Sequence, residues 1–150
     1  ICDNPLIDIP LLRSLIKSHL LDKADYTLPQ GPVPLGSSCE VVRFEALKKV
    51  NALAESSMYR EHVTTWFHEH PSSFKVKHVR PPDYLRDHDF RLTVDTDQDF
   101  QLMDELFKNL PHSPDSPLAL NTVIDYLIAH PKTAALNINI PQVDWRKKNH

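Results

Sequence analysis

The clearest hydrophobic pattern in the chain is an alternation over residues 90–94 that gives way to a helical repeat. Apolar side chains at 90, 92 and 94 alternate with polar ones, which predicts a half-buried strand. Asp95 stands where the alternation stops, and Thr96 and Asp99 have the spacing of a helix-capping box. A helix is predicted next, because apolar residues then recur at helical spacing: Phe100, Met103, Phe107 and Leu110. Asp95 would thus lie at the carboxyl end of a strand, where open α/β sheets bind ligands; the alternative is that it only caps a loop.

Similar patterns predict short strands and amphipathic helices along the rest of the chain. The first helix is expected to begin after Asp8 as N-cap and to run to about Lys23. A second begins at Phe44. A third follows Ser56 or Ser57, with one apolar stripe formed by Tyr59, Val63, Trp66 and Phe67. The last strong helix starts near 120 and ends at Pro131. Extended segments are expected at 25–28, 39–43, 74–79 and 136–140, and a polar tail at 144–150. Helices that alternate with short strands predict an α/β fold.

Length and composition narrow the classes of protein. The chain has 150 residues, which suits one domain, and a formal net charge of −3, which gives no footprint for nucleic acid or anionic membrane. No apolar run is long enough to span a bilayer. Two cysteines, Cys2 and Cys39, form neither a disulfide framework nor a zinc spacing, so a cytoplasmic location is expected. Because the chain begins at Ile1 without an initiator Met, we expect it to be the carboxyl-terminal part (1–150) of a longer single domain.

Candidate metal ligands are few. His68 and His70 are two positions apart on a predicted helix and point in different directions, so solvation of a helix end is favoured over zinc binding. No phosphate-binding glycine motif occurs. Asp3 and Asp95 each follow apolar residues at a predicted strand end, and two carboxylates brought together would suit Mg²⁺ and a phosphorylated ligand.

Six stretches, taken together and in order, resemble the cytidylyltransferase family of the spore-coat polysaccharide biosynthesis type, which is related to the synthetases of CMP-linked sialic acid and CMP-linked ketodeoxyoctonate. The more specific ones are Tyr59-Arg-Glu-His-Val-Thr64 and Arg91 to Phe100, which contains Val94-Asp-Thr96. The looser ones are Cys2-Asp-Asn-Pro-Leu-Ile-Asp8, Ala24-Asp-Tyr-Thr27, Gly36 to Val41, and the segment from Asp125-Tyr-Leu127 through His130-Pro131 to Leu136-Asn137.

This resemblance implies a nucleotide-diphospho-sugar transferase-like three-layer α/β/α sandwich. It also implies a Mg²⁺-dependent reaction in which a sugar hydroxyl attacks the α-phosphate of CTP and pyrophosphate leaves, in surface-polysaccharide precursor synthesis. Asp3 and Asp95 match the family's catalytic, metal-binding positions. Four residues match positions near the sugar: Glu40, Arg60, Glu61 and His62. Arg60 suits the carboxylate of an acidic sugar through bidentate pairing.

The chain also departs from the family pattern. Cys2 replaces a glycine, Ser38 replaces an acid before Glu40, and the family's amino-terminal CTP-binding segment has no counterpart here. Two alternatives to a sugar cytidylyltransferase follow. One is a non-catalytic α/β remnant that binds a sugar or a partner protein, and the other is a different Mg²⁺-dependent phosphoryl-transfer enzyme. The family is often dimeric, so a homodimer is a further expectation.

Overall fold

A computed structural model describes residues 3–54 and 56–141, without the side chains of Ser57 and Glu61; Cys2 and the polar tail lie outside the described residues. The elements are α1 (Ile9–Asp22), β1 (Tyr26–Pro29), β2 (Val41–Val42), α2 (Phe44–Leu53), α3 (Ser57–Glu61), α4 (Thr65–Glu69), η1 (Pro71–Ser73), β3 (Val76–Val79), η2 (Asp83–Leu85), α5 (Asp97–Asn109), α6 (Leu120–Ala129) and α7 (Pro131–Ala134). The mixture of helices and strands is the α/β class that the sequence predicts.

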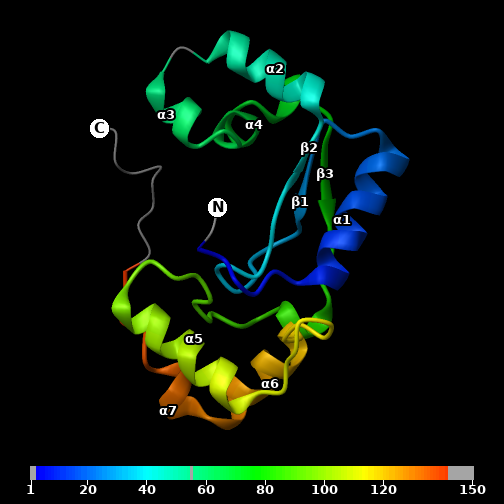
Figure 1. Ribbon diagram of the computed structural model, residues 1–150. Helices are drawn as coiled ribbons and strands as arrows, with labels where there is room; N and C mark the ends of the chain where they lie inside the picture. Colours follow the sequence, from blue (N-terminus) through cyan, green and yellow to red (C-terminus); the bar gives the residue numbers. More distant parts are fainter. Residues whose placement is uncertain (1–2, 55, 142–150) are drawn as a thin grey trace.

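The described strands form a small sheet in the order β2-β1-β3. β1 pairs antiparallel with β2, with Tyr26 opposite Val42, and parallel with β3, with Tyr26 opposite Val76. The parallel pairing requires a long crossover between β1 and β3, which the chain makes through α2, α3 and α4. These helices gather at one end of the sheet, α5, α6 and α7 gather at the other, and α1 runs alongside the strands (Figure 1).

Two apolar cores correspond to the two ends of the molecule. The larger joins α1, α5 and α6 and includes Leu11, Leu15, Leu102, Leu106 and Ile124. The smaller lies under α2 and α4 and includes Tyr26, Val50, Phe67 and Phe74. Tyr26 therefore connects β1 of the sheet to the smaller core.

The predicted helix starts are confirmed where a local cap specifies them. The Asp8 carboxylate accepts a hydrogen bond from Leu11 N at 2.7 Å at the start of α1. Ser56 caps α3 through Met58 N, and Thr96 and Asp99 form the expected capping box at the start of α5. These motifs depend on residues within one turn of each other, which is why sequence spacing identifies them.

Three predictions about secondary structure and buried faces are wrong, in whole or in part. The stretch expected as one helix from Ser57 to Pro71 is two short helices, with a break at 62–64. On α5 the buried face holds Leu102, Met103 and Leu106, whereas Phe100 is 64% exposed. The segment 136–140 forms turns rather than a strand.

The segment 90–94 is extended but does not join the sheet. Arg91 makes one parallel bridge with Leu35, and Val94 N donates instead to Asp3 O, so the segment binds two different neighbours and forms no continuous ladder. Gly36 permits the close approach, because a Cβ there would lie 2.6 Å from the Leu92 carbonyl oxygen.

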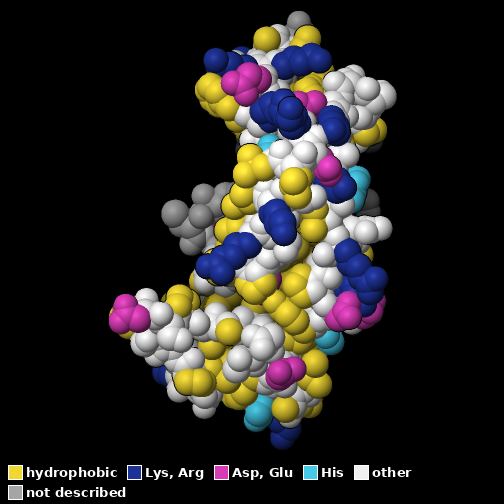
Figure 2. Space-filling view, turned by 90° about the vertical axis from the view of Figure 1, so that its right-hand side faces the viewer, with side chains coloured by type: hydrophobic (Ala, Val, Ile, Leu, Met, Phe, Trp, Pro, Cys, Tyr) yellow, Lys and Arg dark blue, Asp and Glu magenta, His cyan; other side chains and the backbone are white. Residues whose placement is uncertain are grey.

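The face presented by α1 carries apolar side chains interspersed with Lys and Arg (Figure 2). Leu20 and Leu21 on this helix are 69% and 72% exposed. Within the part of the chain that the structure describes, no helix has the length and apolarity needed to span a bilayer.

Candidate active site

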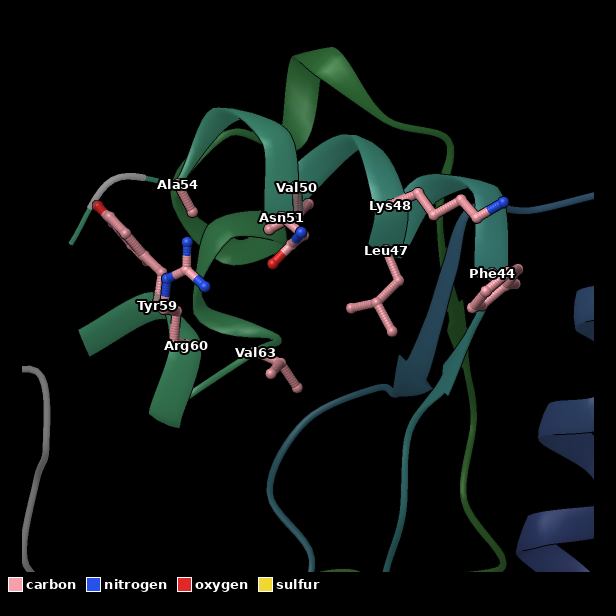
Figure 3. A pocket seen from close by; sticks show the side chains of 9 residues that line it. All are labelled: Phe44, Leu47, Lys48, Val50, Asn51, Ala54, Tyr59, Arg60 and Val63. Atoms are coloured by element: carbon pink, nitrogen blue, oxygen red, sulfur yellow. The ribbon is translucent and has the colours of Figure 1, made fainter. Parts of the chain in front are cut away.

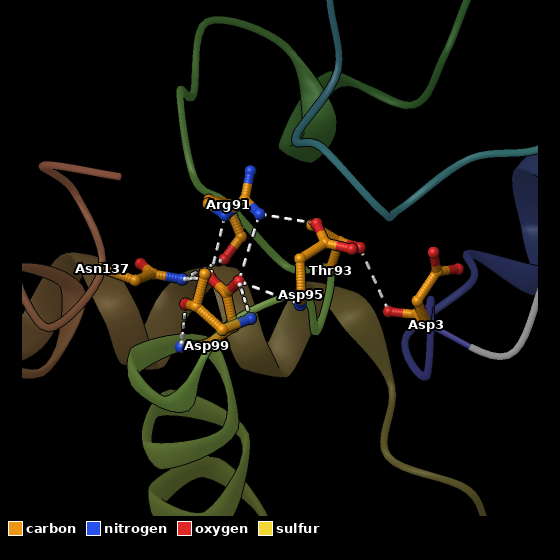
Figure 4. A network of polar contacts seen from close by, with 7 residues as sticks. Asp3, Arg91, Thr93, Asp95, Asp99 and Asn137 are labelled. Atoms are coloured by element: carbon orange, nitrogen blue, oxygen red, sulfur yellow. Dashed lines mark hydrogen bonds and ion pairs between the residues drawn. The ribbon is translucent and has the colours of Figure 1, made fainter. Parts of the chain in front are cut away.

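The structure brings together the backbone segments that carry Asp3 and Asp95. The carbonyl oxygen of Asp3 accepts hydrogen bonds from Val94 N at 2.7 Å and from Thr93 Oγ1 at 3.2 Å. Asp95 follows Val94 directly. The two acids are 92 positions apart in the sequence, but the backbone segments that carry them lie side by side (Figure 4).

Arg91 links the Asp95 carboxylate to a buried neighbour. Its Nη2 donates to Asp95 Oδ2 at 2.6 Å and to Asp99 Oδ2 at 3.1 Å, and its Nε donates to Asp99 Oδ1 at 2.9 Å. The Asp95 side chain is about half exposed, while that of Asp99 is fully buried. Arg91 therefore connects an accessible carboxylate to an anchored one (Figure 4).

Asp99 is anchored by several further donors. Its oxygens accept hydrogen bonds from Asp95 N at 3.0 Å, Thr96 N at 3.1 Å and Asn137 Nδ2 at 2.8 Å. Burial alone would raise the pKa of the Asp99 carboxyl, but these donors and Arg91 outweigh it and lower the pKa to about 2. Asn137 also donates to Arg91 O at 2.9 Å, which fixes the carboxyl-terminal segment to the site.

Asp3 and Asp95 both carry carboxylates, which are the ligand type that Mg²⁺ prefers. Asp3 Oδ1 is buried and has no hydrogen-bond partner among the described residues, so it is an acceptor whose lone pairs are unused. No cluster of three or more His, Cys, Asp or Glu suited to a metal occurs in the described residues. Two carboxylates still suffice for Mg²⁺, which commonly uses one or two, with water and substrate phosphates as its other ligands.

Glu40 lies just before β2 and lines a cavity of about 700 Å³. Asn4, the residue after Asp3, lines the same cavity, as does Thr64 from the break between α3 and α4. Glu40 accepts a hydrogen bond from the Tyr26 hydroxyl and lies near His68. The position of Asn4 places this cavity next to the segment that carries Asp3, one of the two candidate metal ligands.

The other residues matched to the sugar site lie on or beyond α3. Arg60 lines a second cavity of about 450 Å³ together with Asn51 and Lys48, which belong to α2 (Figure 3). Val63 lines both this cavity and that of Glu40, so the two cavities adjoin. His62 is half-buried where α3 ends, and the side chain of Glu61 lies outside the described residues. Glu40 and Arg60 thus line two different cavities that adjoin each other.

Sequence reasoning missed four polar residues that support these side chains. Arg91 and Asn137 lie in stretches that carry the family resemblance, but neither was assigned a role in the site. Tyr26 and His68 are 42 positions apart, and no spacing rule joins residues so distant. The only local signal was the capping box, which identified Asp99 but not its partners.

Comparisons with known proteins found similar sequences. The family model described as cytidylyltransferase matches residues 1–136. The chain is 37% identical to the uncharacterized protein MJ1063 of Methanocaldococcus jannaschii, over 97% of this chain and 58% of that protein. It is 32% identical to the spore coat polysaccharide biosynthesis protein SpsF of Bacillus subtilis, over 88% of this chain and 54% of SpsF.

A solved cytidylyltransferase from Leptospira borgpetersenii has the same fold, with a TM-score of 0.79 and 21% identity over 93% of this chain and 58% of that one. The fold expected from the resemblance is therefore confirmed. The chain spans little more than half the length of each of these relatives.

Proposed function

The chain belongs to the cytidylyltransferase family, and from this premise we propose that its protein transfers a cytidylyl group from CTP to a sugar in surface-polysaccharide precursor synthesis. The similarity to SpsF, a spore coat polysaccharide biosynthesis protein, supports this pathway. The observation that carries the proposal is that Asp3 O accepts hydrogen bonds from Val94 N and Thr93 Oγ1. These bonds bring together the two backbone segments whose acids the family resemblance expects at the metal.

The proposed reaction forms one bond and breaks one. The anomeric hydroxyl oxygen of the sugar bonds to the α-phosphorus of CTP, the bond from that phosphorus to the β-phosphate oxygen breaks, and the hydroxyl proton is released. Mg²⁺, held by Asp3 and Asp95, would neutralise charge on the phosphate oxygens. This chain would contribute chiefly by placing groups, since such catalysis rests on position and charge.

The remaining residues have proposed roles in binding the sugar. Arg60 would pair with the carboxylate of an acidic sugar, and no described side chain forms an ion pair with it. Glu40 and His62 would contact other parts of the sugar. Glu61 is also proposed to lie near the sugar, because it matches a family position there. Arg91 would hold one oxygen of Asp95 while leaving the carboxylate accessible.

The test is pyrophosphate release by the full-length gene product with CTP, Mg²⁺ and a panel of acidic sugars. We expect release that requires both a sugar and Mg²⁺. The Asp95→Asn variant should lose at least about a hundredfold in turnover, because a carboxamide is a poor Mg²⁺ ligand. Its melting temperature should stay close to that of the wild type, because Asp95 is about half exposed.

The matched control is Asp97→Asn, which changes an exposed carboxylate two residues further on, in the first turn of α5. Unchanged turnover in Asp95→Asn would overturn the metal assignment. If the folded full-length protein releases no pyrophosphate with any sugar, the non-catalytic sugar- or partner-binding module becomes the better explanation.

A further inference from the structure

A hydrogen-bonded chain of three side chains stands behind the cavity that Glu40 lines. The Tyr26 hydroxyl donates to Glu40 Oε1 and lies 2.9 Å from His68 Nε2. Because the tyrosine proton points to Glu40, His68 must donate through Nε2–H to the tyrosine oxygen. His68 Nε2 is also 3.7 Å from Glu40 Oε1. The three residues come from β1, from the segment before β2, and from α4.

Tyr26 is the fixed member of this chain. It is fully buried, and its ring stacks on Phe67 with centroids 4.9 Å apart, while His68 meets it edge-on at 5.4 Å. Burial, followed by the hydrogen bond to Glu40, raises the pKa of Tyr26 above its ordinary value, so the phenol remains a donor. A rigid buried donor of this kind holds one oxygen of Glu40 in a defined place.

The exposed part of Glu40 faces a cavity with little other charge. About a third of its side chain is exposed. Among the described residues that line the cavity, Glu40 is the only charged one, and the polar ones besides it are Asn4, Ser38, Cys39 and Thr64. A carboxylate is an acceptor only, so it can bind O–H and N–H groups but repels another carboxylate.

We propose that Glu40 accepts a hydrogen bond from a hydroxyl or N–H group of the sugar, and that Tyr26 and His68 are positioning residues that hold Glu40 in place for this contact. The proposal rests on the proposed function in taking a sugar as the ligand. A sugar carboxylate would be bound away from Glu40, and Arg60 in the adjoining cavity offers it a cation. The Tyr26–Glu40–His68 chain therefore determines specificity for the hydroxylated or aminated part of the sugar.

The experiment uses the full-length protein and four sugars: N-acetylneuraminic acid, ketodeoxyoctonate, N-acetylglucosamine and glucose. Binding is followed by saturation-transfer NMR, and turnover by pyrophosphate release. For each sugar that binds, Glu40→Gln and Tyr26→Phe should weaken binding and raise its KM by about tenfold, as expected for loss or misplacement of one charged hydrogen bond. The KM for CTP and kcat should change by less than about threefold, because neither residue would touch the phosphates.

Two further variants separate positioning from a general structural role. In a Glu40→Ala background, Tyr26→Phe should have no further effect on sugar binding, because the hydroxyl acts through Glu40. His68→Gln should bind sugar better than His68→Phe, since the glutamine amide can still donate to Tyr26. The control is Tyr84→Phe, which removes a phenol that donates to Asp8 at 2.7 Å in another part of the molecule.

The outcomes distinguish this proposal from the proposed function. Sugar binding without pyrophosphate release would refute the transferase but support the Glu40 site if Glu40→Gln and Tyr26→Phe lose binding. Equal losses in Tyr84→Phe, or normal sugar KM and binding in Glu40→Gln, would overturn the Glu40 site. Binding of none of the four sugars by the folded wild type would also overturn it.

Discussion

Replacing Asp99 by Asn tests whether the buried Arg91–Asp99 pair anchors the candidate metal site. The substitution preserves the shape of the side chain but removes its charge and turns one acceptor into a donor. Asp99 has no exposed side-chain surface, and it accepts hydrogen bonds from both the Nε and Nη2 atoms of Arg91. Arg91 is itself only 12% exposed, so the change leaves a largely buried cation with less compensation.

The structure gives the magnitude in two ways. The pKa of Asp99 falls from an ordinary value of 3.8 to about 2 on folding, which corresponds to about 2.4 kcal/mol of stability at neutral pH. Breaking a buried ion pair by removing one partner typically costs about 3–5 kcal/mol. Arg91 keeps Asp95 as a partner, so we expect the lower part of this range, about 3 kcal/mol.

The pH dependence has a definite sign. Because folding lowers the pKa of Asp99, its carboxylate stabilises the folded state above about pH 4, and this stabilisation is lost as the pH falls towards 2. The wild type should therefore lose stability on acidification through this group, whereas Asp99→Asn should not. The difference between the two proteins should shrink by about 1 kcal/mol between pH 7 and pH 3.

The assay is urea unfolding followed by circular dichroism at pH 7 and pH 3, with Asp97→Asn as the control. Asp97 lies in the same first turn of α5 but is exposed, so it experiences the helix dipole without the Arg91 network. A difference between wild type and Asp99→Asn that is the same at both pH values would refute the charge argument. So would an equal loss of stability in Asp97→Asn.

Two further predictions concern the backbone around the site, and both are checked by urea unfolding at neutral pH. Gly36→Ala should lower the free energy of unfolding more than Gly31→Ala does, by more than about 1 kcal/mol. Both glycines have positive φ, but only at Gly36 would the added Cβ meet the Leu92 carbonyl oxygen, at 2.6 Å. Equal losses of stability in the two variants would show that this close approach is unimportant. Asp8→Ala should lower the free energy of unfolding by about 2 kcal/mol through loss of the α1 cap, and Asp8→Asn, which can still cap the helix, should recover part of it; no difference between these two variants would contradict the capping role.

The elements that could be predicted from the sequence are those that short-range chemistry specifies. The N-cap at Asp8 and the capping box at Thr96 involve residues three positions apart, so their spacing is visible directly. The short strands at β1 and β3 were also expected, because their apolar residues and flanking prolines mark them locally. Asp3 and Asp95 were paired as candidate metal ligands because each follows apolar residues at a predicted strand end, and the family resemblance points to the same two acids.

The misplaced elements have a common physical cause. The segment 90–94 alternates like a sheet strand, but whether a strand pairs depends on which backbone lies beside it. Here Leu92 N donates to Leu35 O and Val94 N donates to Asp3 O, so two different segments accept the hydrogen bonds of the strand. Phe100 falls on the same helical repeat as Met103, yet the packing of α5 buries Leu102 and Leu106 instead. Period alone cannot show which face of a helix its neighbours will cover.

The sequence by itself determined the α/β class, most helix starts and, through its resemblance, the two candidate metal ligands. Only the tertiary structure decided how the side chains of the site are held. Asn137 reaches Asp99 across 38 positions, and His68 reaches Tyr26 across 42. Contacts of this kind arise because packing brings distant elements together, and a buried carboxylate such as that of Asp99 is stable only where that packing delivers enough donors.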